Sequence, residues 1–158
     1  MSLFVSPTKS PAPKTKNITA ISLLFVGLLL LMVVAQLFAF EEFAPALSTL
    51  ELPGGEPLSS VLAALIVTGE VIALPFLLRM RLSPAFRVVS MVASWVVVTF
   101  WLAITVWEAT YAHASSSTLL GSAVPLPVGW WNVCIVVSLG ILAAWSSWGM
   151  WPLTTKTK

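Results

Sequence analysis

The sequence predicts an all-α integral membrane protein, an antiparallel four-helix bundle with both termini in the cytoplasm. Apolar residues make up 58% of its 158 residues and charged residues only 9%, whereas a soluble domain carries about 25% charged residues. The apolar residues also gather in four runs, each close to the roughly 20 residues that a helix needs to cross a bilayer. Too few charges remain to cover a surface that faces water, so lipid is the expected solvent.

The first segment, 1–17, is rich in Ser, Thr, Pro and Lys and lacks hydrophobic periodicity. This composition predicts a disordered cytoplasmic tail. The first apolar run, 18–40, is longer than the about 7–15 residues of a signal peptide's apolar region, and no small-residue cleavage motif follows it. We therefore expect an uncleaved helix, which Glu41 and Glu42 close.

A loop is expected to follow these two residues. It contains a stretch with Pro and paired Gly, 51–57, and leads to the second apolar run, 58–78, which contains Glu70 and Pro75. Pro and paired Gly break regular structure, so this loop should separate two helices. The connection after the second run is short. The second and third helices are therefore expected to form an antiparallel hairpin.

The third run, 84–107, follows Ser83, whose hydroxyl is suited to cap the helix that begins there. Glu108 is expected to follow the end of this helix, ahead of a polar loop. The fourth run spans 128–151, and a short cytoplasmic tail, 152–158, finishes the chain. These boundaries give one transmembrane domain, 18–151, between two tails.

The distribution of charge orients the bundle. If the sides alternate across four helices, every basic residue falls on the side of the termini and the second connection, and five of the six acidic residues fall on the other. Lys and Arg near helix ends resist translocation, so the basic side should be cytoplasmic, with the bacterial inner membrane as the expected location. The basic residues are Lys9, Lys14, Lys16, Arg79, Arg81, Arg87, Lys156 and Lys158.

Arg79, Arg81 and Arg87 cluster at the hairpin between the second and third runs. We interpret them as topology determinants that also contact anionic lipid, with docking of an acidic partner or a phosphate as the alternative. Tryptophans near the helix ends support the boundaries, since indole rings favour headgroup depth. Trp95 and Trp101 lie deeper in the third run, and we interpret them as packing or lipid-contact groups.

Glu70 is the one ionisable residue deep inside a predicted span, about 18 Å from one end of its helix and about 12 Å from the other at 1.5 Å per residue. A charged carboxylate at that depth is costly unless it is paired or hydrated. A carboxyl that can be charged or neutral suits a proton relay or a cation-coupled carrier, and it can hydrogen-bond a quinone. The structural alternative is a hydrogen bond to a neighbouring helix. The candidate partners are Ser90, Ser94, Thr99, Ser138 and Ser146.

Pro75 removes one backbone donor, so we expect a kink just after Glu70. Such a bend suits a binding site, and it is also common in membrane helices that have no site. Small residues four positions apart predict faces where another helix approaches closely. These residues are Ser60, Ala64 and Thr68 on the second helix, and Gly140 and Ala144 on the fourth.

Few side chains offer catalytic chemistry. Cys134 is the single cysteine, which excludes an internal disulfide and a CxxC pair. His113 lacks the neighbours of a metal site, and Ser115 to Ser117 lack an evident base. The chain also has no phosphate-binding glycine loop and no nucleic-acid motif. We therefore expect no catalytic activity of its own, no metal and no nucleic-acid partner.

Two segments carry a resemblance to a known family. They read Phe38-Ala-Phe-Glu-Glu-Phe-Ala-Pro-Ala-Leu47 and Leu65-Ile-Val-Thr-Gly-Glu-Val-Ile-Ala-Leu-Pro-Phe-Leu-Leu-Arg79. Over about residues 30–105 the chain resembles the DoxX-like and methylamine-utilisation MauE-like family of small four-helix membrane proteins. On that resemblance Glu70 matches a Glu in the middle of the second helix, and Phe40 and Phe43 match an aromatic extracytoplasmic segment. The chain departs from the family after its first helix, where acidic residues replace a basic one.

The resemblance implies a role in quinone-linked sulfur oxidation or in the maturation of periplasmic redox enzymes. We therefore expect an accessory subunit that contacts membrane lipids and a membrane or periplasmic redox protein. In it, Glu70 would bind a quinone-like ligand or tie helices together. One alternative is a small proton-coupled carrier or exporter, a homo-oligomer that uses Glu70 as the coupling residue. The other is a membrane scaffold without a ligand.

Overall fold

The computed structural model describes residues 10, 12–48, 55–111, 116–121, 124 and 126–151. The named elements within these residues are all helices, joined by turns and short connections, and Ser117 and Leu126 form an isolated bridge. Four of the helices are long and apolar enough to cross a membrane, which is the architecture of a small multi-pass membrane protein. The helices are α1 (Lys16–Phe38), α2 (Phe40–Ser48), α3 (Gly55–Leu77), α4 (Pro84–Thr110) and α5 (Trp130–Met150).

The short helix α2 corrects one expectation, because a loop was predicted there. Glu41 and Glu42 lie in its first turn and do not close α1, which ends at Phe38. Phe43 and Leu47 are fully buried four residues apart, so one face of α2 packs on the bundle. Tertiary burial of this face accounts for a helix whose sequence contains Pro.

Other boundaries shift by a few residues. α1 begins at Lys16, so the last two residues of the predicted tail are helical, and α3 begins at Gly55, inside the predicted Pro/Gly loop. α4 extends to Thr110, which places Glu108 in its last turn and not beyond it. The predicted cap is confirmed, since Phe86 N–H donates to the Ser83 hydroxyl at 3.2 Å.

Several expectations lie outside the described residues. Most of the N-terminal tail, the loop at 49–54, residues 112–115 and the tail 152–158 are among them. The residues concerned include Lys9, Glu51, His113, Ser115, Lys156 and Lys158.

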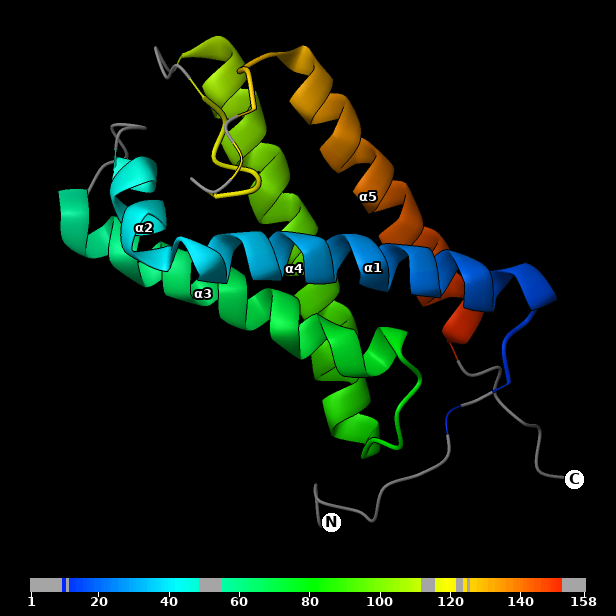
Figure 1. The fold of residues 1–158 in the computed structure, drawn as a ribbon. Coiled ribbons are helices and arrows are strands. Elements are labelled where there is room, and N and C mark those ends of the chain that lie inside the picture. Colours follow the sequence, from blue (N-terminus) through cyan, green and yellow to red (C-terminus); the bar gives the residue numbers. More distant parts are fainter. Residues whose placement is uncertain are drawn as a thin grey trace, which may run out of the picture.

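The four long helices form a ring. α1 packs on α3 and on α5, while α4 packs on the other sides of α3 and α5 (Figure 1). The short α2 packs beside α3, and Figure 1 shows it at the start of that helix. Apolar side chains from every element fill the interior, including Phe25, Leu29, Phe43 and Trp101.

Two glycines allow the closest helix contacts. A Cβ on Gly149 of α5 would lie 2.3 Å from the Ile18 side chain of α1, and a Cβ on Gly69 of α3 would lie 2.9 Å from Val97 of α4. Small residues let helix backbones approach closely, and these two positions were not anticipated. Of the predicted small residues, Gly140 lies close to another helix, with its Cβ position 3.4 Å from Val98.

The other predicted small residues lie on the outer sides of their helices within this chain. The residues concerned, Ser60, Ala64, Thr68 and Ala144, are all exposed. The packed face of α3 instead carries Ser59, Ala63, Ile66 and Glu70. Each of the predicted α3 positions lies one or two residues past a buried one, and one residue rotates the side chain by about 100° around a helix with 3.6 residues per turn.

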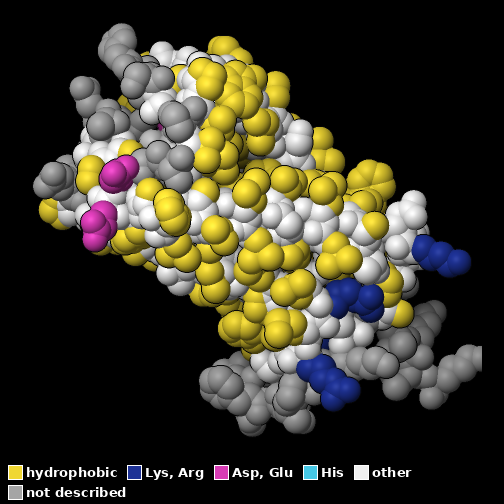
Figure 2. All heavy atoms as spheres, in the orientation of Figure 1, with side chains coloured by type: hydrophobic (Ala, Val, Ile, Leu, Met, Phe, Trp, Pro, Cys, Tyr) yellow, Lys and Arg dark blue, Asp and Glu magenta, His cyan; other side chains and the backbone are white. Residues whose placement is uncertain are grey.

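The charged side chains visible in Figure 2 lie at two opposite ends of the molecule. Acidic side chains are visible at the end where α2 lies, basic side chains at the opposite end, and a largely hydrophobic surface between them. Such a surface matches helices whose outer sides meet lipid, because hydrocarbon solvates apolar groups well and charges poorly.

Candidate functional site

Glu70 lies in the middle of the bundle. Its side chain is 0% exposed and projects from α3 toward α1 and α4. The indole Nε1–H of Trp101 donates to Glu70 Oε1 at 2.9 Å, and the amide Nε2 of Gln36 donates to the same oxygen at 3.3 Å. One carboxylate oxygen therefore links three helices.

The helix faces explain why these partners meet. On α1 the buried positions Ser22, Phe25, Leu29, Met32 and Gln36 recur every three or four residues, so Gln36 lies on the face that turns toward the core. Trp101 is fully buried in α4 and stacks against Phe43 of α2, with ring centroids 6.3 Å apart. Helix packing therefore sets the positions of both donors, Gln36 and Trp101, independently of their hydrogen bonds to Glu70.

Trp101 packs in the core, as one of its two predicted roles required, and its N–H also donates to Glu70, which was not anticipated. The predicted serine and threonine partners also do not bond Glu70. Ser94 donates to Met91 O in its own helix, and Ser138 donates to Cys134 O. Thr99 is exposed, and the hydroxyl of buried Ser146 has no hydrogen-bond partner among the described residues.

Ser90, another predicted partner of Glu70, acts on the backbone beside Pro75. Its hydroxyl donates to Ile72 O and accepts from Phe76 N–H at 3.0 Å. Those two groups are partners in an uninterrupted helix, so the hydroxyl enters the hydrogen-bond ladder of α3 one turn after Glu70. Such an insertion is a recognised cause of bending, and it supports the expected irregularity at Pro75.

Gln36 also contacts the loop between α4 and α5. Its Nε2 donates to Leu119 O at 3.4 Å, while Gly121 lies so close that a Cβ there would be 3.2 Å from the Gln36 Cα. Gly121 has φ 65°, a left-handed conformation that glycine adopts without steric cost. Glu70, Gln36 and Trp101 together form what we call the central cluster. Residues 116–121, which we call the plug, therefore cover the Gln36 side of this central cluster.

Glu108 holds the plug against α4. Its Oε1 accepts from the Thr118 N–H at 2.9 Å and the Thr118 hydroxyl at 2.7 Å, and its Oε2 accepts from the Ser117 hydroxyl at 2.7 Å. The side chain is 2% exposed. This role was not predicted, because Glu108 was expected to follow the end of the helix, whereas α4 continues to Thr110.

Two oxygens of the central cluster have no protein donor among the described residues, Glu70 Oε2 and Gln36 Oε1. Buried polar atoms in native proteins are nearly always hydrogen-bonded, so each such exception requires an explanation. The pair can accept hydrogen bonds, and Glu70 can also take up a proton. The cluster can therefore act as a structural tie or as a site for a donor group.

The three predicted arginines lie at the basic end. Arg79 adopts φ 56° at the turn after α3, Arg81 is exposed, and Arg87 lies half-buried in the first turn of α4. The N-terminal segment joins this end, since Lys14 N–H donates to Gly149 O at 3.2 Å and its ammonium lies 4.5 Å from the Trp148 ring centroid. A cation over an indole face is an attractive contact.

Within the described residues, no three His, Cys, Asp or Glu side chains come together in a way that could hold a metal ion. Comparisons of the chain with protein-family models, with curated proteins and with solved structures find no match. The site must therefore be interpreted from its own geometry.

Proposed function

We propose that the chain is a non-catalytic accessory subunit of a membrane redox or maturation system, similar in role to DoxX-like and MauE-like proteins. The observation that carries this proposal is the enclosure of Glu70, whose one oxygen receives N–H groups from α1 and α4. Buried hydrogen bonds favour a single helix arrangement, because breaking them leaves polar groups unsatisfied in a low-dielectric interior. A fixed arrangement is what a subunit needs in order to present a constant surface to a partner.

The proposed setting is the bacterial inner membrane, with an antiparallel bundle and both termini cytoplasmic. The separation of acidic from basic side chains supports it (Figure 2), because Lys and Arg mark the cytoplasmic side. Lys16→Cys and Glu42→Cys, each in a Cys134→Ser background, test it in intact spheroplasts. A membrane-impermeant maleimide should label position 42 and not position 16. The reverse labelling would invert the topology.

The functional test is purification of the full chain from native membranes in mild detergent, with mass spectrometry of proteins and lipophilic molecules. An accessory subunit should recover a redox or maturation protein in stoichiometric amount, with or without a quinone. Glu70→Gln, which retains one carbonyl acceptor, should still recover it, whereas Glu70→Ala should recover less. Exposed Val96→Ala is the matched control on α4. Recovery of a homo-oligomer alone would contradict the proposal.

A second candidate, a proton-coupled carrier, is favoured by one observation, namely that Glu70 Oε2 and Gln36 Oε1 both lack a hydrogen-bond partner among the described residues. A coupling carboxyl must exchange protons, so a free oxygen at the centre of the bundle suits that role. This candidate also requires the cluster to open and the chain to form a homo-oligomer. In liposomes it predicts proton-coupled flux that Glu70→Gln abolishes, while an unaltered flux would exclude it.

A further inference from the structure

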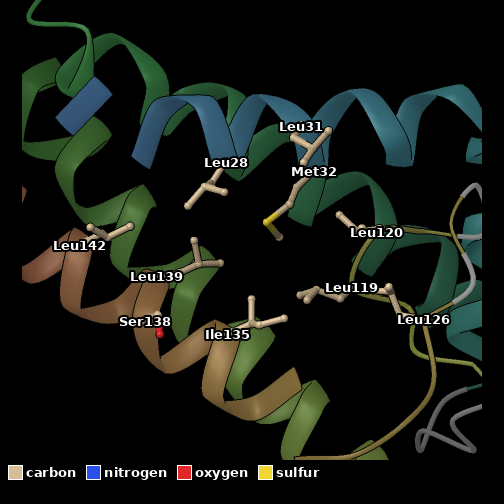
Figure 3. A pocket seen from close by; sticks show the side chains of 10 residues that line it. All are labelled: Leu28, Leu31, Met32, Leu119, Leu120, Leu126, Ile135, Ser138, Leu139 and Leu142. Carbon is tan, nitrogen blue, oxygen red and sulfur yellow. The ribbon is translucent and has the colours of Figure 1, made fainter. Parts of the chain in front are cut away.

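A cavity that opens to the outside lies between the helices α1 and α5. At one end they touch where the Ile18 side chain fills the space beside Gly149. Toward the other end Leu119 and Leu120 of the plug lie between them, and a cavity of about 270 Å³ remains (Figure 3). Its principal walls come from Leu28 and Met32 on α1 and from Leu139 on α5.

The chemistry of the walls restricts the occupant. None of the ten lining residues is charged, and nine of them are Leu, Ile or Met. The tenth is Ser138, whose hydroxyl already donates to Cys134 O at 2.8 Å. An apolar cavity of roughly 150 Å³ in a protein stays dry and binds benzene or xenon. A larger cavity of the same kind should take hydrocarbon and exclude water.

The position of the cavity identifies the source of that hydrocarbon. Leu28 lies near the middle of the 23-residue α1, so the cavity is at the depth of the lipid tails if the helix spans a bilayer. Leu31 and Ile135, which also line it, are 58% and 39% exposed. The cavity therefore opens on the outer surface of the helix ring, where lipid chains are the surrounding medium.

We propose that this cavity binds one acyl chain of a membrane phospholipid. The chain would complete the contact between α1 and α5 where the helices diverge, and would press on Leu119 and Leu120. Because Leu119 O accepts from Gln36, which donates to Glu70, the bound chain would also support the central cluster. The lipid is then a structural ligand of the bundle, and the inference depends on the membrane location but on no partner protein.

The experiment uses the full chain in nanodiscs made of phosphatidylglycerol with a diazirine in the middle of one acyl chain. After illumination, peptide mass spectrometry locates the crosslinks. The expected result is enrichment at Leu28, Met32 and Leu139 over the equally deep but outward-facing Ile141, which is 56% exposed. Crosslinks spread evenly over the exposed residues would overturn the proposal, as would their absence from the cavity residues in a chain shown to be monomeric.

Two matched variants sharpen the result. Leu139→Trp fills the cavity and should lose the crosslinks at Leu28 and Met32, while Ile141→Trp adds the same side chain to the outer face and should retain them. If Leu139→Trp does not fold, Leu28→Phe makes the same test from α1. Unchanged crosslinking in a folded, cavity-filled variant would overturn the proposal. None of these results depends on recovering a partner, so the accessory role is tested separately.

Discussion

Glu70 and Glu108 are both buried carboxyl groups, yet their hydrogen bonding differs. Glu108 has both oxygens bonded, by two hydroxyls and one backbone N–H. Glu70 has two N–H donors on one oxygen and none on the other among the described residues. Glu108 finds its donors nine and ten residues along the chain, whereas those of Glu70 are 31 and 34 residues away on other helices.

The difference shows how a nearby loop and distant helices satisfy a buried carboxyl group. The plug can adjust its backbone and rotate its hydroxyls until each oxygen of Glu108 is occupied. Glu70 depends on side chains whose positions are already set by helix packing. A carboxyl group whose donors all lie on rigid helices can keep one oxygen without a hydrogen bond. Such an oxygen can accept a proton or a hydrogen bond from a ligand.

The largest expected effect is that of Glu70→Ala. This change removes the acceptor of the Trp101 and Gln36 N–H groups, and a buried donor left without a partner costs about 1–3 kcal/mol. Thermal unfolding of the purified chain in one detergent should show a clear drop in Tm. Glu70→Gln, which keeps a carbonyl oxygen, should lose much less. Equal stability of the alanine variant and the wild type would show that the bonds are not needed.

Glu108→Ala should have a smaller effect, about 1–2 kcal/mol, because its hydroxyl and N–H donors lie near the end of α4, where water can replace the carboxylate. The change should act on the plug first. Hydrogen exchange by mass spectrometry should show faster exchange in residues 116–121, with α3 unaltered. Faster exchange across the whole chain would mean that Glu108 supports more than the plug.

Gly121→Ala tests the link between the two carboxyl groups. The positive φ and the 3.2 Å contact with Gln36 both resist a Cβ, and a non-glycine residue in this conformation costs about 1–2 kcal/mol. We expect the plug to loosen and the Tm to fall. Gly27→Ala is the matched control, since nothing lies within 4 Å of its Cβ position and alanine favours a helix. A neutral Gly121→Ala would show that the plug does not depend on this turn.

The smallest effect should be the coupling between Glu70→Gln and Glu108→Gln. The sites communicate through the 3.4 Å bond from Gln36 to Leu119 O, and a single weak bridge predicts a coupling of about 0.5 kcal/mol in a double-mutant cycle. Unfolding of both single variants and the double variant measures it. Strict additivity would mean that the plug and the central cluster are independent.

Much of the fold follows from the sequence, because a bilayer-spanning helix needs a long apolar run that composition alone reveals. Four helices long and apolar enough to cross a membrane are confirmed, and their ends lie within a few residues of most of the expected ones. The helix α2 was missed because its stability comes from burying Phe43 and Leu47 on other elements, which local propensity does not report. The extension of α4 to Thr110 was missed for the same reason, since the plug buries Glu108.

The candidate site was only half predictable. Depth in an apolar run singled out Glu70, but its partners depend on how helices rotate against one another. One signal was present in α1, where Gln36 continues the spacing of Ser22, Phe25 and Leu29. The predicted small residues of α3 lie on an exposed face, turned about 100° or more from the buried one. The rotation of a helix about its own axis decides which residues face the core. This rotation is known only when the neighbouring helices are placed.

The two bonds of Gln36 also bear on how the chain is made. Its acceptors, Glu70 and Leu119, are 34 and 83 residues further along the chain. During synthesis the first helix therefore enters the membrane with an amide that has none of its final partners. That amide can reach Glu70 only after α3 has been made, and Leu119 only after the segment that follows α4 has been made. The first helix therefore lacks its final hydrogen bonds until residue 119 has been made. We expect nascent chains that stop short of residue 119 to hold α1 loosely and to be degraded faster.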